Sequence, residues 1–300
     1  MKTTKFLSKG SVVRIISTAR KVSPTEVEPA IKVLKSWGLG VQLGRNLYAE
    51  HNQFAGTDDQ RLQDLHSALD DPTVEMIWCA RGGYGTVRLL DRIDWTSFLR
   101  KPKLVVGYSD VTILLNHISE VLHVECLHAT MPINIKNLLT AEDQQSITSL
   151  KQYIFGVESQ HKLLQHPFTR KGDFTGRVIG GNLSMIYSFL GSNTQVDPKG
   201  KVLLIEDLDE YLYHIDRMMM NLRRNELFDG LAGVLVGGLT DMNDNTIPFG
   251  ESAEQIVRRH FEDYDYPVYF GVQIGHCSPN LAIPIGGTVE VRNNTLIVPR

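Results

Sequence analysis

Ser109 stands where an expected buried strand turns into an expected helix. The run 104–106 is apolar and β-branched, which is typical of a buried strand, and Gly107 ends it. Apolar residues then recur at helical spacing through 110–118. Such a turn lifts a hydroxyl out of the sheet and places it near the positive end of a helix, as a nucleophile requires. An ordinary serine helix cap fits the same pattern, and the strict G-x-S-x-G motif fails because Val111 replaces its second glycine.

A serine nucleophile needs a base, and the base needs a group that orients it. His276 lies among turn residues just past an apolar run, and His128, which ends another apolar run, is its rival. Glu206 follows the buried run 202–205 and is the best-placed orienting carboxylate. Acidic residues at such a point also satisfy helix N-termini, a role open to Asp207.

The motif Arg81-Gly-Gly-Tyr-Gly85 sits between a predicted strand and a predicted helix. Its glycines let backbone N–H groups approach a ligand closely. Three interpretations stay open: a phosphate cradle, a tight turn, or an oxyanion hole that pairs the N–H of Gly83 with that of Asp110. The motif has neither the Walker lysine pattern nor the spacing G-x-G-x-x-G.

Composition argues against several classes of protein. The chain of 300 residues has 31 basic and 34 acidic side chains and no basic run, so no nucleic-acid partner is expected. Its three cysteines are widely spaced without a C-x-x-C, which favours neither a zinc site nor a disulfide framework. We find no apolar run of transmembrane length and no secretory signal, so we expect a soluble cytoplasmic protein without a membrane partner.

Strands and helices alternate through the first half of the chain, which predicts a parallel, doubly wound α/β sheet with its site at the carboxyl ends of the strands. The second half is richer in short strands. We therefore expect a domain over 1–160 that carries the nucleophile and a β-rich mixed domain over 161–300 that carries the Glu and the His. The expected strands are 11–17, 41–43, 76–80, 104–106, 124–127, 177–179, 202–205, 233–236, 268–270, 288–292 and 295–298. One helix is expected to start at a capping box of Ser23 and Glu26 and to end at Gly38, and another to be capped by Thr57-Asp-Asp-Gln60 and to stop at Asp70. Further helices are expected at 87–90, 144–155, 183–190, 213–222 and 251–261.

Five motifs together resemble the LD-carboxypeptidase family, the serine peptidases that include muramoyltetrapeptide carboxypeptidases and the microcin C immunity peptidases. The resemblance runs from about residue 62 to 285 and implies a flavodoxin-like N-terminal domain, a β-rich C-terminal domain, a site between them and a homodimer. In chain order the motifs are Arg81-Gly-Gly-Tyr-Gly85 with Arg88-Leu-Leu, Gly107-Tyr-Ser-Asp110, Gly180-Gly-Asn-Leu183, Ile205-Glu-Asp207 with Ile215-Asp-Arg217, and Gly275-His276.

The resemblance also implies catalytic roles. Ser109 would be the nucleophile, His276 the general base and then the general acid, and Glu206 the residue that orients it. The backbone N–H groups of Gly83 and Asp110 would form the oxyanion hole. No metal or other cofactor is expected.

Substrate contacts are expected around the same motif. A cation should meet the terminal carboxylate, and Arg81 is the candidate, with the alternative that it braces its loop; Gly82 and Tyr84 should border the substrate. Two loops depart from the family pattern. The family often has His-Gly-Pro-Met where this chain has His128-Ala-Thr-Met131, and a Pro-Ser loop where it has Ser17-Thr-Ala-Arg20. Both departures bear on specificity.

The expected function is release of terminal D-alanine from muropeptide tetrapeptides, by hydrolysis of an L,D-amide bond during peptidoglycan recycling. One alternative is an immunity-type serine peptidase that cleaves a peptidyl or aminoacyl nucleotide antibiotic. Another is a non-catalytic small-ligand binding module in which Ser109 only caps a helix. A cysteine hydrolase is a third, although Cys79 lies in an apolar run and Cys277 is adjacent to His276 in sequence only.

Overall fold

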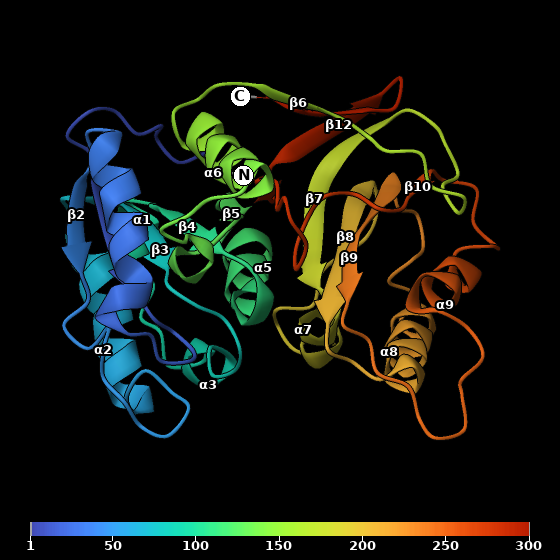
Figure 1. The fold of residues 1–300 in the computed structure, drawn as a ribbon, viewed down its shortest axis with the longest axis horizontal. Helices are drawn as coiled ribbons and strands as arrows, with labels where there is room; N and C mark the ends of the chain where they lie inside the picture. The colour runs from blue at the N-terminus through green and yellow to red at the C-terminus, as the bar shows by residue number, and fades with distance from the viewer. Residues whose placement is uncertain (1, 300) are drawn as a thin grey trace.

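The computed structural model describes residues 2–299, which form two β-sheets side by side, each accompanied by helices (Figure 1). The first sheet has the strand order β11-β5-β4-β3-β1-β2, and all of its pairings are parallel except that of β11 with β5. Without β11, this is the flavodoxin-like order of a doubly wound fold, as expected. Its strands are β1 (Val12–Ile16), β2 (Gly40–Leu43), β3 (Val74–Cys79), β4 (Leu104–Gly107), β5 (Cys126–His128) and β11 (Ile283–Ile285).

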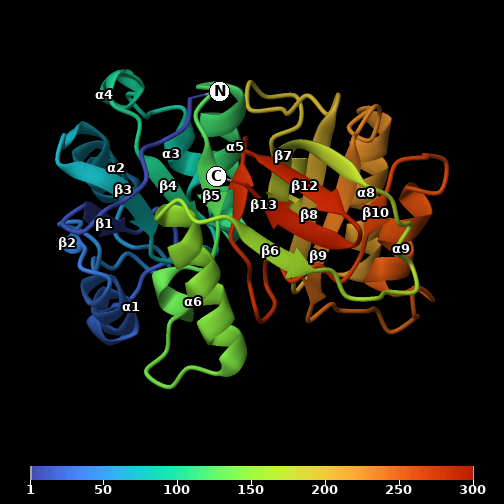
Figure 2. The same cartoon turned by 90° about the horizontal axis from the view of Figure 1, so that it is seen from above.

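Helices cover both faces of the first sheet, with α1 and α6 on one face and α4 and α5 on the other (Figure 2). Their starts follow the expected capping chemistry: the N–H of Ser23 donates to Glu26 (2.7 Å), and Thr57 exchanges hydrogen bonds with Gln60. The helices are α1 (Pro24–Ser36), α2 (Asp58–Asp70), α3 (Val87–Leu90), α4 (Thr96–Arg100), α5 (Thr112–Glu120) and α6 (Ala141–Ile154), with short 3₁₀ turns at Ser109–Val111 and Pro132–Asn134.

The second sheet is mixed, as predicted, with the order β10-β9-β8-β7-β12-β13-β6. Strands β7 to β10 are parallel, and β12, β13 and β6 add antiparallel pairs. The elements are β6 (Ser159–Lys162), β7 (Phe174–Asn182), α7 (Leu183–Ser188), β8 (Lys201–Leu208), α8 (Leu212–Arg224), β9 (Gly233–Thr240), α9 (Ala253–His260), β10 (Val268–Tyr269), β12 (Thr288–Arg292) and β13 (Thr295–Val298).

Three elements were absent from the expected set: α4, β6 and β11. Strand β6 is a polar edge strand, and β11 contains Pro284 in a run of three residues, so neither has the apolar alternation that marks a strand. The position of the domain boundary stays a prediction. Strand β6 begins at Ser159 and belongs to the second sheet, whereas β11, from the C-terminal half, closes the first.

The two sheets are joined where α5 packs against β7. The side chain of Asn116 accepts a hydrogen bond from Gly180 N–H and donates one to Gly180 C=O, both at 2.9 Å. Next to it, Asn182 N–H donates to Thr112 Oγ1 (3.2 Å). All of these groups are buried, so the joint depends on hydrogen bonds that water cannot replace.

We expect Asn116→Ala to destabilise the protein by about 2–3 kcal/mol, because it leaves two backbone groups of Gly180 buried without partners. Urea unfolding would measure the change. Asn225→Ala is the matched control, since Asn225 is exposed and bonds only within its own helix end; it should change the free energy of unfolding by less than about 0.5 kcal/mol. Equal effects of the two substitutions would contradict the assigned joint.

Candidate active site

Ser109 has a backbone conformation that few serines adopt. Strand β4 ends at Gly107, Tyr108 is extended, and Ser109 has φ of +62°. A non-glycine residue in this region costs about 1–3 kcal/mol and persists where the surrounding structure imposes it. Helix α5 starts only at Thr112, with Val111 at its N-cap, so Ser109 does not hold the capping position. The expected strand–turn–helix presentation of Ser109 is therefore present, and the helix-cap alternative is not.

A segment that we call the glycine strap, residues 81–85, passes directly over this serine. A Cβ atom built on Gly82 would lie 2.8 Å from Ser109 Cβ, 2.9 Å from its Oγ and 3.3 Å from the backbone N of Asp110. No side chain fits in that space, so glycine is required there. Gly83 has φ of +109°, and its N–H has no acceptor within residues 2–299.

The side chain of Asp110 fixes the far end of the strap. Its Oδ2 accepts the backbone N–H of Thr86 at 2.9 Å, and burial raises the pKa of the carboxyl. Asp110 thus connects the strap to the turn at Ser109. Its backbone N–H lies under Gly82, beside Ser109 Oγ, as a second oxyanion donor would need to.

Glu206 and His276 meet in the second domain. Glu206 is fully buried in β8, and its Oε2 lies 2.6 Å from His276 Nδ1 and accepts the backbone N–H of the same histidine at 3.2 Å. Gly275 makes this approach possible: it has φ of +90°, and a Cβ there would lie 2.4 Å from Glu206 Cγ. With Nδ1 held by the carboxylate, Nε2 is the nitrogen left to exchange a proton.

Each member of this pair shifts the pKa of the other so that the charged form is favoured. Burial alone would raise the pKa of Glu206, but the positive charge and hydrogen bonds of His276, together with the nearby imidazole of His128, lower it to about 2. Burial lowers the pKa of His276, and the negative charge of Glu206 more than reverses this, so the pKa is raised overall. Glu206 thus stays ionised, and His276 is a stronger base than a free imidazole.

Asp207, the next residue, points elsewhere. It accepts hydrogen bonds from Asn182 Nδ2 (2.8 Å) and from Ser184 N–H (2.9 Å) at the start of α7. Burial, with the nearby charge of Glu206, raises its pKa to about 7. It has the helix-terminus role considered for it in the sequence.

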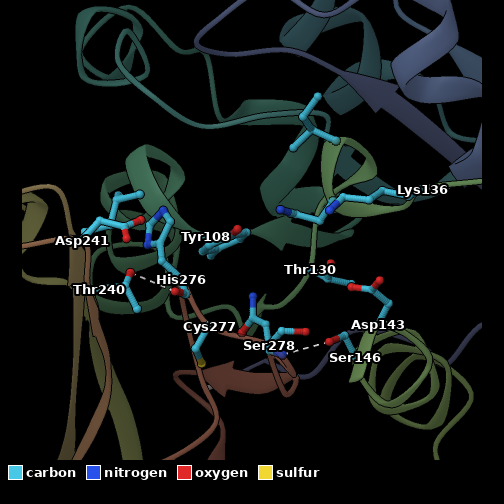
Figure 3. A pocket seen from close by; sticks show the side chains of 14 residues that line it. Tyr108, Thr130, Lys136, Asp143, Ser146, Thr240, Asp241, His276, Cys277 and Ser278 are labelled. Carbon is cyan, nitrogen blue, oxygen red and sulfur yellow. Dashed lines mark hydrogen bonds between the residues drawn. The ribbon is translucent and has the colours of Figure 1, made fainter. Parts of the chain in front are cut away.

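A cavity of about 460 Å³ opens beside His276 (Figure 3). His276 and Tyr108 face it from the second and first domains, with ring centroids 4.8 Å apart. His128, the rival base, lies behind Tyr108 and is fully buried, so it has no access to this space. Other lining residues of polar character are Thr130, Asn134, Lys136, Asp143, Ser146, Thr240, Asp241, Ser278 and Asn280.

Ser109 and His276, the predicted nucleophile and base, come from different domains and are not hydrogen-bonded to each other. The side chain of His276 is 13% exposed. Within residues 2–299, its ring and its backbone N–H hydrogen-bond Glu206, and its carbonyl accepts a hydrogen bond from Thr240 Oγ1. Catalytic hydrogen bonds of this kind commonly tighten only when substrate is bound.

The predicted substrate-binding residues lie along the strap. Arg81 is half-buried and reaches the carbonyl of Lys21 (3.4 Å) and the carboxylate of Glu26 (4.0 Å). Tyr84 is 44% exposed and packs against Phe54. Arg20 was not singled out from the sequence as a substrate contact, although it ends a loop that departs from the family pattern. Its side chain lies along Gly83: a Cβ on that glycine would be 2.5 Å from Arg20 Cδ.

The two cysteines proposed as nucleophiles are poorly suited to attack. Cys79 is fully buried in β3, and burial raises the pKa of its thiol to about 12. Cys277 borders the cavity, but burial raises its thiol pKa to about 11 and its Sγ lies within hydrogen-bonding distance of two backbone carbonyls. Both thiols are therefore protonated near neutral pH and weak as nucleophiles.

Comparison with known proteins agrees with this architecture. Residues 13–129 match the family model of the LD-carboxypeptidase N-terminal domain, and residues 175–291 match that of the C-terminal domain. A probable murein peptide carboxypeptidase of Bacillus subtilis is 36% identical over 290 residues, covering 94% of this chain and 89% of that protein. The chain belongs to the LD-carboxypeptidase family. Its members are peptidases, so a peptide hydrolase is expected in this fold.

Further relatives extend the comparison. A murein tetrapeptide carboxypeptidase of Pseudomonas aeruginosa is 29% identical, covering 95% of this chain and 94% of that protein. A crystal structure of muramoyltetrapeptide carboxypeptidase from Oxalobacter formigenes has a TM-score of 0.84 at 23% identity, over 96% of this chain and 99% of that one. The microcin C7 self immunity protein MccF, in complex with aspartyl sulfamoyl adenosine, has a TM-score of 0.87 at 19% identity, over 99% and 98%. At these identities the two structures establish a shared two-domain fold.

Within residues 2–299, no three or more His, Cys, Asp and Glu side chains cluster in a way that would hold a metal ion. Each helix in the same range is too short or too polar to cross a bilayer.

We expect Glu206→Gln to lower kcat by about three to four powers of ten, because the neutral amide neither stabilises the imidazolium nor fixes its tautomer. The negative charge of Glu206 raises the pKa of His276, so its removal should also move the acid limb of kcat/KM to lower pH. Steady-state peptide hydrolysis across that limb measures both effects. Glu210→Gln is the control, since Glu210 holds His214 at the same 2.6 Å away from the site. If the acid limb of kcat/KM stayed in place in Glu206→Gln, the pairing of Glu206 with His276 in the reaction would be contradicted.

Proposed function

We propose that this protein is a serine-type LD-carboxypeptidase that releases terminal D-alanine from muropeptide tetrapeptides. The observation that carries the proposal is the buried Glu206–His276 pair, whose imidazole ring lies 4.8 Å from that of Tyr108, the residue directly before a strained serine beneath a glycine strap. The murein carboxypeptidases among its relatives support this choice of substrate.

In the proposed reaction, Ser109 Oγ attacks the carbonyl carbon of the diamino acid that precedes D-alanine. His276 Nε2 takes the hydroxyl proton, and Glu206 stabilises the imidazolium through Nδ1. The N–H groups of Gly83 and Asp110 receive the oxyanion; each such donor contributes about two to three powers of ten in rate. His276 then protonates the amine of D-alanine as the C–N bond breaks, which leaves an ester on Ser109.

Water completes the proposed cycle. His276, neutral again, removes a proton from a water molecule that attacks the ester carbonyl. The second tetrahedral intermediate collapses, the proton returns to Ser109 Oγ, and the tripeptide leaves with a new carboxylate. The step needs no metal ion or cofactor, because the histidine carries each proton in turn.

The direct test is mass spectrometry of the products from L-Ala-γ-D-Glu-meso-diaminopimelyl-D-Ala, with wild type and Ser109→Ala side by side. We expect the wild type alone to release D-alanine. Release by both proteins would contradict Ser109 as nucleophile. Release by neither, together with cleavage of an aspartyl sulfamoyl adenosine by the wild type, would favour the immunity-type alternative, and no turnover of either ligand would favour the binding module.

For the terminal carboxylate we propose Arg20 as the direct contact, with Arg81 bracing the strap. Arg81 already contacts Lys21 and Glu26, whereas Arg20 is exposed along Gly83 and pairs with no carboxylate within residues 2–299. Arg20 is thus the cation beside the strap that is available to a ligand.

We expect Arg20→Ala to lower kcat/KM by roughly 10- to 100-fold, the effect of losing a hydrogen bond to a charged group. The variant should also lose the preference for a free C-terminal carboxylate over the carboxamide form of the same peptide. Arg81→Ala is the matched control and should retain that preference. If Arg81→Ala lost the preference and Arg20→Ala retained it, Arg81 would be the residue that contacts the carboxylate.

Two further expectations belong to this proposal. We propose that the protein works in the cytoplasm, where recycled muropeptides would meet it, and that it forms a homodimer. Family resemblance supports both. Light scattering of the purified chain would decide the second.

A further inference from the structure

His128 is a buried imidazole that the proposed reaction does not use. It ends β5, next to β4, and none of its surface is exposed. Neither of its ring nitrogens has a hydrogen-bond partner within residues 2–299. Each unpaired buried polar group of this kind costs about 1–3 kcal/mol of stability. The unpaired imidazole of His128 therefore calls for an explanation.

The nearest acceptor is the unused oxygen of the triad carboxylate. Glu206 Oε2 is occupied by His276, while Oε1 is buried and also lacks a partner within the described chain. The distance from His128 Nε2 to Glu206 Oε1 is 3.8 Å. A shift of roughly 0.8 Å would turn this contact into a normal N–H···O hydrogen bond and satisfy both atoms together.

The surroundings of His128 leave it few other partners. Its ring lies 5.5 Å from that of Tyr108, which lies 4.8 Å from the ring of His276 on its other side. Gly181 of β7 closes the opposite side: a Cβ there would lie 3.5 Å from His128 Cδ2. The titratable groups around Glu206 are His128, His276, Tyr108, Asp207 and Cys277.

We propose that His128 is a positioning residue that donates its Nε2–H to Glu206 Oε1, so that two imidazoles hold one carboxylate. This inference rests on the proposed triad. The second hydrogen bond fixes the plane of the carboxylate against His276 Nδ1. It also draws negative charge away from Oε2. The carboxylate then stabilises the protonated form of His276 less strongly. His128 acts through Glu206 and touches no substrate.

The test compares two replacements of His128. In His128→Phe an aromatic ring remains but the donor is lost, so we expect kcat to fall about 10- to 100-fold with KM unchanged. The carboxylate then stabilises protonated His276 more strongly. The acid limb of the kcat/KM–pH profile should therefore move to higher pH. His128→Gln offers an amide N–H to Glu206 and should recover most of kcat and return the limb toward its wild-type position.

His117→Phe is the matched control. His117 is also buried, stacks on Trp95 and bonds Thr194 (2.9 Å), away from the triad. Its replacement should lower the melting temperature without moving the acid limb. The proposal would be overturned if the acid limb of kcat/KM stayed in place in His128→Phe. It would also be overturned if kcat of His128→Gln were no higher than that of His128→Phe.

A second readout is independent of the substrate. The proton between His276 Nδ1 and Glu206 should give a low-field proton NMR signal, assigned by its loss in His276→Ala. We expect this signal to shift in His128→Phe and to stay in place in His117→Phe. If the wild type releases no D-alanine, the substrate assignment fails, but the NMR comparison still decides the role of His128: no shift would overturn it.

Discussion

The site depends on keeping one carboxylate ionised in the protein interior. An isolated buried carboxylate would take up a proton, because desolvation of its charge costs several kcal/mol. Glu206 escapes this through His276, which presents both a ring nitrogen and a backbone N–H to the same oxygen. The glycine at 275 permits that approach, and the position of His276 relative to the cavity follows from it.

This pair lies in one domain and the serine in the other, so the catalytic geometry also depends on how the domains meet. The joint between α5 and β7 is a buried hydrogen-bond network rather than a simple apolar contact. It involves Thr112 and Asn116, on the helix that follows Ser109, and Asn182, which also binds the neighbour of Glu206. The same few residues therefore fix the position of the helix that follows Ser109 relative to the strand that carries Glu206.

Sequence patterns were sufficient for much of this arrangement. Alternating strands and helices predicted the doubly wound sheet, and the step from an apolar run through Gly107 to a helical period located the turn at Ser109. The pairing of Glu206 with His276 required family motifs, because local patterns contain no information about contacts between distant segments. For the same reason His128 could be ranked only as a rival base, and its position behind the carboxylate became visible only in the fold.

Other features could not be predicted for identifiable physical reasons. Strand β11 has three residues and a proline, so its pairing with β5 comes from tertiary packing rather than propensity. The positive φ of Ser109 is imposed by the strap above it and the helix after it, and serine itself has no such preference. Arg20 reaches the strap only because β1 and β3 are neighbours in the sheet.

The central claim is that Ser109 is a nucleophile activated by His276. Intact-protein mass spectrometry after treatment with a fluorophosphonate tests it most directly, followed by peptide mapping of the adduct. We expect one adduct on Ser109 in the wild type, none in Ser109→Ala and greatly slowed labelling in His276→Ala. An adduct elsewhere, no adduct in correctly folded wild type, or equal labelling in His276→Ala would contradict it.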